Sequence, residues 1–193
     1  MRKICIMPSF WAVLGFLIFL GMGRQYSLLL LAAMIHEFGH GMVIFLYGNT
    51  IEEIRLIPGG VDIRYRERRF SYSADIMIPL AGPLANLLTA MIFSVLDIAK
   101  ADYFIGLNLL LCFFNLLPLH PLDGGKALYA VMSCLWPIGG ERAFFLFSAA
   151  LSALIFGVVC AGCFYDYQDW WSMVVFGYIL SRQNIRWLFS KSI

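Results

Sequence analysis

Long apolar runs, broken by short polar segments, account for most of this chain. We predict helices at about 4–22, 26–47, 73–96, 103–117, 142–164 and 170–189. A helix needs about 20 apolar residues to cross a membrane, and every run except 103–117 comes close to that length. The short run can continue through a break into 125–135, since interrupted helices occur where protein surrounds the backbone. The pattern predicts an all-α polytopic membrane protein with six transmembrane helices.

The first apolar run has a second interpretation, a secretory signal peptide, because Arg2 and Lys3 precede it. No small-x-small cleavage site follows the run, and Gly23-Arg24-Gln25 leads directly into the next one. We therefore expect an uncleaved first helix.

The segment between the second and third predicted helices, 50–69, has the two-residue period of strands. Polar and apolar residues alternate along 53–56 and again along 61–66, and Pro58-Gly59-Gly60 between them is typical of a turn. We predict a short membrane-associated β-hairpin between helices 2 and 3. The alternative is a solvated basic loop that rests on anionic lipid.

The composition agrees with a membrane protein. Of the 193 residues 61% are hydrophobic and 13% charged, whereas soluble domains are about half apolar and a quarter charged. The five cysteines lie in or beside apolar segments, which argues against a disulfide framework. Cys160 and Cys163 have a C-x-x-C spacing within an apolar run, and we expect them only to pack.

Basic side chains are distributed unevenly about the six predicted helices. With both termini in the cytoplasm, Arg24 and Lys100 fall outside and the other 12 of the 14 fall inside. The inside set comprises Arg2, Lys3, Arg55, Arg64, Arg66, Arg68, Arg69, Lys126, Arg142, Arg182, Arg186 and Lys191. The tryptophans that flank the last helix, as interfacial anchors do, are Trp170, Trp171 and Trp187. We therefore expect a multi-pass cell-membrane protein with both termini cytoplasmic.

The second predicted helix carries His36-Glu37-Phe38-Gly39-His40. Four residues advance a helix by about 400°, so His36 and His40 share one face about 6 Å apart along the axis. Two imidazoles so placed can bind one metal ion, and zinc suits them. Glu37 follows the first ligand and is the candidate general base toward water.

A catalytic zinc ion requires a third protein ligand. The second and fourth helices both run toward the cytoplasm, so Asp123 should lie at a depth close to that of His40. The aspartates that fall on the opposite side are Asp97, Asp102, Asp166 and Asp169. A metal ion would also offset the cost of a carboxylate at membrane depth. We favour Asp123 as the ligand, with His120 as the alternative.

Several motifs occur in a characteristic order: His36 to His40, Pro58-Gly59-Gly60, Leu80 to Asn86, Asn115-Leu116-Leu117-Pro118 and Leu122-Asp123-Gly124. Together they resemble the site-2 protease family of intramembrane zinc metalloproteases, over about residues 30–130. The order and spacing look most like the sporulation members that process a precursor sigma factor.

The resemblance implies one zinc ion bound by His36, His40 and Asp123, with Glu37 as the catalytic base. It implies that Asn115 positions the substrate or its developing oxyanion. It assigns Asn86 either to substrate binding or to an interhelical hydrogen bond. The hairpin edge, with the residues Val61 and Ile63, would hold an extended substrate by strand addition.

The implied reaction is cleavage of a membrane-associated protein precursor near its cytoplasmic border, with release of a transcription factor. The expected partners are a membrane-tethered protein substrate, the lipid bilayer and membrane-bound inhibitor or regulator proteins, and no nucleic acid. Sporulation relatives often carry a soluble nucleotide-sensing domain, whereas this chain stops at Ile193. We expect a single domain, 1–193, with a catalytic core at about 26–135 and no soluble regulatory domain.

Three other functions remain open. A metal or proton transporter could use His36, Glu37, His40 and Asp123 as a relay, although paired repeats with broken helices are lacking. A proteolytically inactive membrane scaffold is disfavoured by an intact base and ligand set. A prenyl-protein endopeptidase would need a glutamate ligand on a later helix, and the only later glutamate is Glu141.

Overall fold

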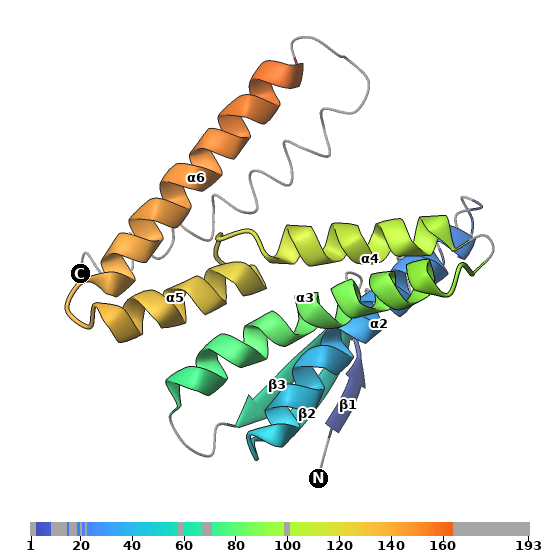
Figure 1. Ribbon diagram of the computed structural model, residues 1–193, viewed down its shortest axis with the longest axis horizontal. Helices are drawn as coiled ribbons and strands as arrows, with labels where there is room; N and C mark the ends of the chain where they lie inside the picture. The colour runs from blue at the N-terminus through green and yellow to red at the C-terminus, as the bar shows by residue number, and fades with distance from the viewer. Residues whose placement is uncertain are drawn as a thin grey trace. The chain divides into compact units, whose positions relative to one another are not determined.

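The computed structural model describes residues 3–8, 15, 19, 21, 23–57, 60–66, 71–98 and 101–163. The chain forms two compact units, Met1–Asn115 and Leu116–Ile193. The first contains β1 (Lys3–Ile6), α2 (Gly23–Leu46), β2 (Thr50–Ile57), β3 (Gly60–Arg66), α3 (Tyr72–Val95) and α4 (Asp102–Asn115), and the second contains α5 (Asp123–Leu135) and α6 (Gly140–Cys163), as labelled in Figure 1.

Among the described residues of the first unit, α2, α3 and α4 are apolar helices, and α3 packs against both α2 and α4. The predicted helices 26–47, 73–96 and 103–117 correspond to α2, α3 and α4 within a few residues. Among the described residues two helices, α2 and α3, are long and apolar enough to cross a membrane, and α4 is apolar but shorter. The predicted helix 170–189 lies outside the described residues, so the count of six remains a prediction.

The predicted start of the first helix at Ile4 is wrong. Residues Lys3–Ile6 form strand β1, which pairs in parallel with β2 from Lys3 opposite Glu53 to Ile6 opposite Leu56. The physical reason is that the backbone of these four residues forms its hydrogen bonds with the edge of β2. The four residues adjoin a long apolar run, so the sequence pattern did not distinguish them from a helix. Most of the remaining run, 9–14, 16–18, 20 and 22, lies outside the described residues.

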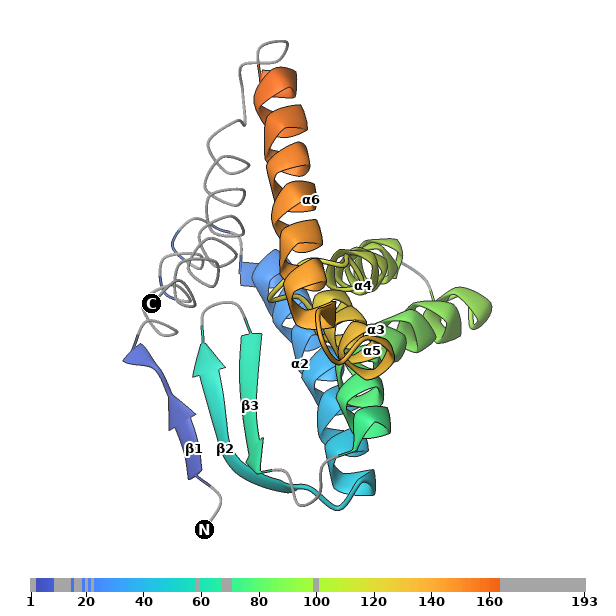
Figure 2. The same ribbon diagram turned by 90° about the vertical axis from the view of Figure 1, so that its left-hand side faces the viewer.

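The predicted hairpin is confirmed, and it belongs to a three-stranded sheet in the order β1-β2-β3 (Figure 2). Strands β2 and β3 are antiparallel, with Ile54 opposite Ile63 and Leu56 opposite Val61. The side chains of Ile63 and Tyr65 pack against the buried cluster of Ile44, Ala74 and Ile78. This packing attaches the sheet to the C-terminal half of α2 and the start of α3.

The end of α2 is set by Gly48, which has a φ of +72°. The amide of Asn49 donates to the carbonyl of Ile44 at 3.1 Å, and that of Gly48 donates to Phe45 at 2.9 Å. A left-handed glycine with such bonds is a common helix stop. His40 therefore lies six residues before the last helical residue, about 9 Å along the axis.

In the second unit, α5 and α6 pack against each other and a folded loop precedes α5. A Cβ at Gly124 would lie 2.8 Å from the carbonyl oxygen of Leu117, and one at Gly125 would lie 2.8 Å from the amide nitrogen of His120. Only glycine leaves room for the loop backbone at these two positions. The loop thereby fixes the start of α5, where Asp123 is the first helical residue.

Candidate metal centre

His36 and His40 lie on one face of α2, as their spacing predicts. Their Nε2 atoms are 3.1 Å apart, and the rings meet edge to face with centroids 4.7 Å apart. Both side chains are buried, with 6% and 9% of their surface exposed. The two imidazoles thus direct one nitrogen each toward the same small volume.

The other ring nitrogen of each histidine contacts α3. The Nδ1 atom of His36 is 2.7 Å from Oδ1 of Asn86, and that of His40 is 2.7 Å from the carbonyl oxygen of Ile78. A carbonyl oxygen only accepts hydrogen bonds, so His40 carries its proton on Nδ1 when the ring is neutral. Its Nε2 then has the lone pair that a metal ligand needs, and such partners orient imidazole ligands.

One stripe of α3 supports both imidazoles, because Ile78, Gly82 and Asn86 follow at four-residue steps. A Cβ at Gly82 would lie 2.7 Å from Nε2 of His36 and would collide with Nε2 of His40. Gly82 therefore preserves the volume toward which the two nitrogens point. Two oriented imidazoles around such a volume fit a zinc ion.

Asn86 and Asn108 form a buried hydrogen-bond network behind His36, and neither side chain has exposed surface. The Nδ2 group of Asn86 donates to the carbonyl of Ala32 at 3.0 Å and to Oδ1 of Asn108 at 2.8 Å. The structure therefore shows Asn86 in interhelical hydrogen bonds, and its substrate contact remains a prediction. Sequence reasoning missed Asn108, whose only signal is a polar residue within an apolar helix.

Glu37 is half-buried on α2 beside His36. One residue turns a helix by about 100°, so its carboxylate leaves the helix from a direction adjacent to the first imidazole. This position is compatible with the predicted role of a base that is not itself a ligand.

Asp123 belongs to the second unit and is 5% exposed. As the first residue of α5 it lies at the positive end of a helix, which favours a carboxylate. The Nζ of Lys126 is 3.0 Å from its Oδ1. Its role as the third ligand remains a prediction.

His120, the alternative ligand, lies in the loop before α5. Its amide donates to Oγ of Ser148 at 3.0 Å, and its ring meets Phe145 with centroids 5.5 Å apart. Burial, and secondarily the charge of Lys126, lower the pKa of His120. The structure thus shows a half-buried ring that packs on α6.

The predicted substrate residues lie at element ends and edges. Asn115 is the last residue of α4, half-buried, and its Nδ2 donates to the carbonyl of Leu111 at 3.0 Å. Ile63 is in β3 with its side chain against the core. Val61 is in β3 opposite Leu56, and its side chain lies outside the described residues. Substrate binding by all three remains a prediction.

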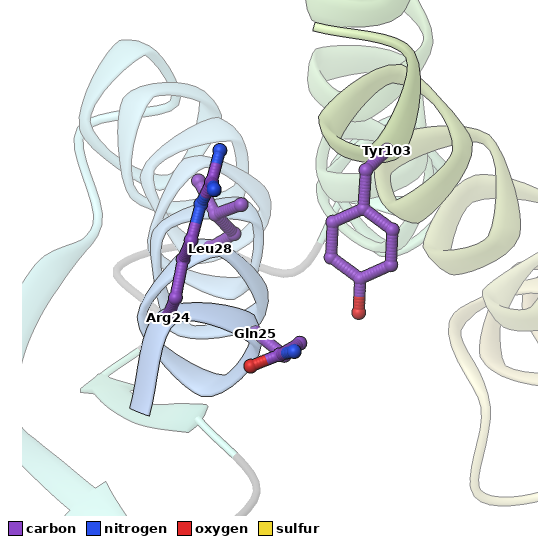
Figure 3. Close-up of a pocket in the computed structure, with 4 residues that line it drawn as sticks. All are labelled: Arg24, Gln25, Leu28 and Tyr103. Atoms are coloured by element: carbon purple, nitrogen blue, oxygen red, sulfur yellow. The ribbon is translucent and has the colours of Figure 1, made fainter. Parts of the chain in front are cut away.

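A pocket of about 300 Å³ lies at the other end of α2, where Tyr103 of α4 faces the first turns of that helix (Figure 3). Its lining residues on α2 are Arg24, Gln25 and Leu28. Leu28 precedes His36 by eight residues, about 12 Å along the axis. The pocket is therefore separate from the histidine pair.

Comparison with known proteins gives a consistent picture. The family model described as Peptidase M50B-like matches residues 9–186. A zinc metalloprotease of Methanocaldococcus jannaschii is 34% identical over 134 residues, which cover 64% of this chain and 35% of that protein. Stage IV sporulation protein FB of Bacillus subtilis is 29% identical over 138 residues, which cover 68% of this chain and 48% of that protein. The chain thus spans about a third to a half of the length of these relatives.

Among solved structures, the site-2 protease from Methanocaldococcus jannaschii matches with a TM-score of 0.66 at 22% identity. The match covers 95% of this chain and 90% of that one, so the two share a fold.

Proposed function

Because the chain belongs to the Peptidase M50B-like family, as its motifs predict, we propose that it is an intramembrane zinc metalloprotease. The observation that carries the proposal is the pair of buried imidazoles on α2, whose Nε2 atoms lie 3.1 Å apart. Each ring is oriented through Nδ1 by α3, and a candidate base, Glu37, is the next residue along the helix.

We assign zinc binding to His36, His40 and Asp123, one ion per chain. Two imidazoles and one carboxylate are a donor set typical of catalytic zinc, which keeps a further position open. Zinc, when bound, supplies Lewis-acid polarisation of the scissile carbonyl and makes water more acidic. The transporter alternative would use the same donors but gains no support from the family.

Glu37 acts as the general base. Its carboxylate accepts the proton of the attacking water and later delivers a proton to the amine of the departing fragment, so the residue ends the cycle unchanged. Asn115, in the last turn of α4, orients the substrate carbonyl through its amide.

We place the reaction in the membrane, near its cytoplasmic face. Large apolar side chains on α2, such as Met34, Phe38 and Met42, recur at four-residue steps and are exposed, as lipid contact requires. On the charge asymmetry of the sequence we assign the C-terminal end of α2 to the cytoplasmic side, and His40 lies about 9 Å from that end.

The substrate is a membrane-tethered protein whose cleavable stretch is extended. Strand β3 is at one edge of the sheet, and an edge strand can bind an extended segment through its main chain. Because the Ile63 side chain packs inward, its contribution to such binding comes from the backbone. The likeness to a sporulation protein leads us to propose a membrane-held precursor of a sigma factor as substrate.

The proposal is tested by reconstituting the protein in liposomes with a model substrate, a soluble tag followed by one transmembrane helix. We expect cleavage that stops on chelation and returns on addition of zinc. Zinc flux across the liposome membrane without cleavage would instead support a transporter.

A further inference from the structure

We propose that Asn108 is a positioning residue which, through Asn86, determines which ring nitrogen of His36 carries the proton. The inference rests on the proposed function and deepens it, since it concerns how one zinc ligand is prepared. Asn108 lies on α4, Asn86 on α3 and His36 on α2, so the network connects these three helices of the first unit.

The direction of each hydrogen bond in the network follows from two main-chain carbonyls, one at each end of the network. The carbonyl of Phe104, 2.8 Å from Asn108, only accepts, so the Nδ2 group of Asn108 must face it. Oδ1 of Asn108 must then face Asn86, where it accepts from Nδ2 at 2.8 Å.

The second donor hydrogen of Asn86 is bound by the carbonyl of Ala32 at 3.0 Å. Both amide hydrogens of Asn86 are thereby used, and only its Oδ1 can face His36, at 2.7 Å. An oxygen at that position accepts, so His36 must donate from Nδ1. The lone pair is consequently on Nε2, which faces Nε2 of His40.

If the Asn86 amide were reversed, the proton of His36 would no longer be held on Nδ1. The amide nitrogen would face His36 and the amide oxygen would face two other oxygens, those of Ala32 and Asn108. The neutral imidazole would then carry its proton on Nε2 and could not ligate zinc through that atom. Asn108 supplies one of the two acceptors that prevent the reversal. Because neither amide has exposed surface, water cannot take the place of this acceptor.

The first measurement reads the proton position directly. Zinc-free full-length protein labelled with ¹⁵N-histidine is examined by NMR at about pH 8.5, above the ordinary imidazole pKa of about 6.5. The chain has three histidines, so single variants assign the signals. We expect Nδ1 of His36 to carry the proton in the wild type, and an Nε2-protonated population to appear in Asn108→Leu. A wild-type proton on Nε2 would overturn the proposal, whether or not the variant folds.

The second measurement is zinc affinity by competition with a chelator. Loss of an outer partner of a histidine ligand typically costs about 10–100-fold, and we expect about tenfold weakening in Asn108→Leu. Asn108→Asp retains an acceptor toward Asn86 and should remain within about threefold of the wild type. The matched control is Cys112→Ser, a buried position one turn further along α4, which should bind zinc as the wild type does.

A double variant separates positioning from helix packing. In Asn86→Asp the ionised carboxylate can only accept, so His36 must donate whichever residue is at position 108. We therefore expect Asn108→Leu to weaken zinc binding in the wild-type background and to have little further effect in the Asn86→Asp background. Equal losses in both backgrounds would show that Asn108 only joins the helices. Neither readout depends on proteolysis, so failure here leaves the proposed function standing.

Discussion

At the scale of single residues, Gly82 controls how closely α3 approaches the two imidazoles. Alanine favours helix more than glycine by about 1 kcal/mol, so Gly82→Ala should not weaken α3 itself. Its Cβ would nevertheless contact Nε2 of both histidines. We expect zinc affinity to fall by at least about tenfold, measured by chelator competition. Gly106→Ala on α4 is the control, because its Cβ would meet nothing within 4 Å. Equal affinity in both variants would refute the role of Gly82.

Single substitutions also distinguish the two candidates for the third zinc ligand, Asp123 and His120. We expect Asp123→Asn to weaken zinc binding by about 100-fold or more, because a neutral amide replaces a carboxylate ligand. His120→Ala should retain zinc, since that ring packs on Phe145. Metal content of the two purified variants distinguishes them, and the reverse pattern would make His120 the ligand.

Some parts of the site were predictable from residue types and others were not. His36, Glu37 and His40 are identified by a spacing that places two imidazoles on one helix face. The carbonyl of Ile78 carries no sequence signal, because every residue has one. Asn108 could be singled out only as a polar residue in an apolar run, and its partners across three helices are not encoded by any local spacing.

At the scale of elements, the helices α2, α3 and α4 were predictable because long apolar runs between polar breaks have few alternatives. The hairpin β2–β3 was predictable because its strands alternate and adjoin a turn. Strand β1 was missed because it is four residues long and pairs with residues about fifty positions away. Parallel pairing of that kind leaves no local pattern in the chain.

Strand β3 offers a test of the proposed substrate edge. Ile63→Pro removes one backbone N–H donor from the strand and the packing of the isoleucine side chain. We expect slower cleavage with zinc content unchanged. Ile63→Ala removes the side-chain packing but keeps the donor, and so serves as the control. Similar cleavage rates in the two variants would mean that packing, not the strand backbone, matters at this position.

At the scale of the whole molecule, the orientation in the membrane determines where the product goes. From the charge asymmetry of the sequence we predict that the C-terminal end of α2, and His40 near it, lie on the cytoplasmic side. We expect a tagged substrate to be cut near its cytoplasmic border and its soluble part to enter the cytoplasm. Fractionation and the mass of the new terminus give the answer. A cut at the outer border would reverse the predicted topology.

The account depends most directly on the division of roles between Glu37 and the two histidines. The measurement is zinc content together with cleavage of the liposome-bound substrate for Glu37→Gln and His36→Ala. We expect Glu37→Gln to retain one zinc per chain and to cleave at least about 10²–10⁴-fold more slowly, because it loses only the base. His36→Ala should lose both zinc and cleavage. A Glu37→Gln protein that cleaves at the wild-type rate, or one that has lost its zinc, would contradict the account.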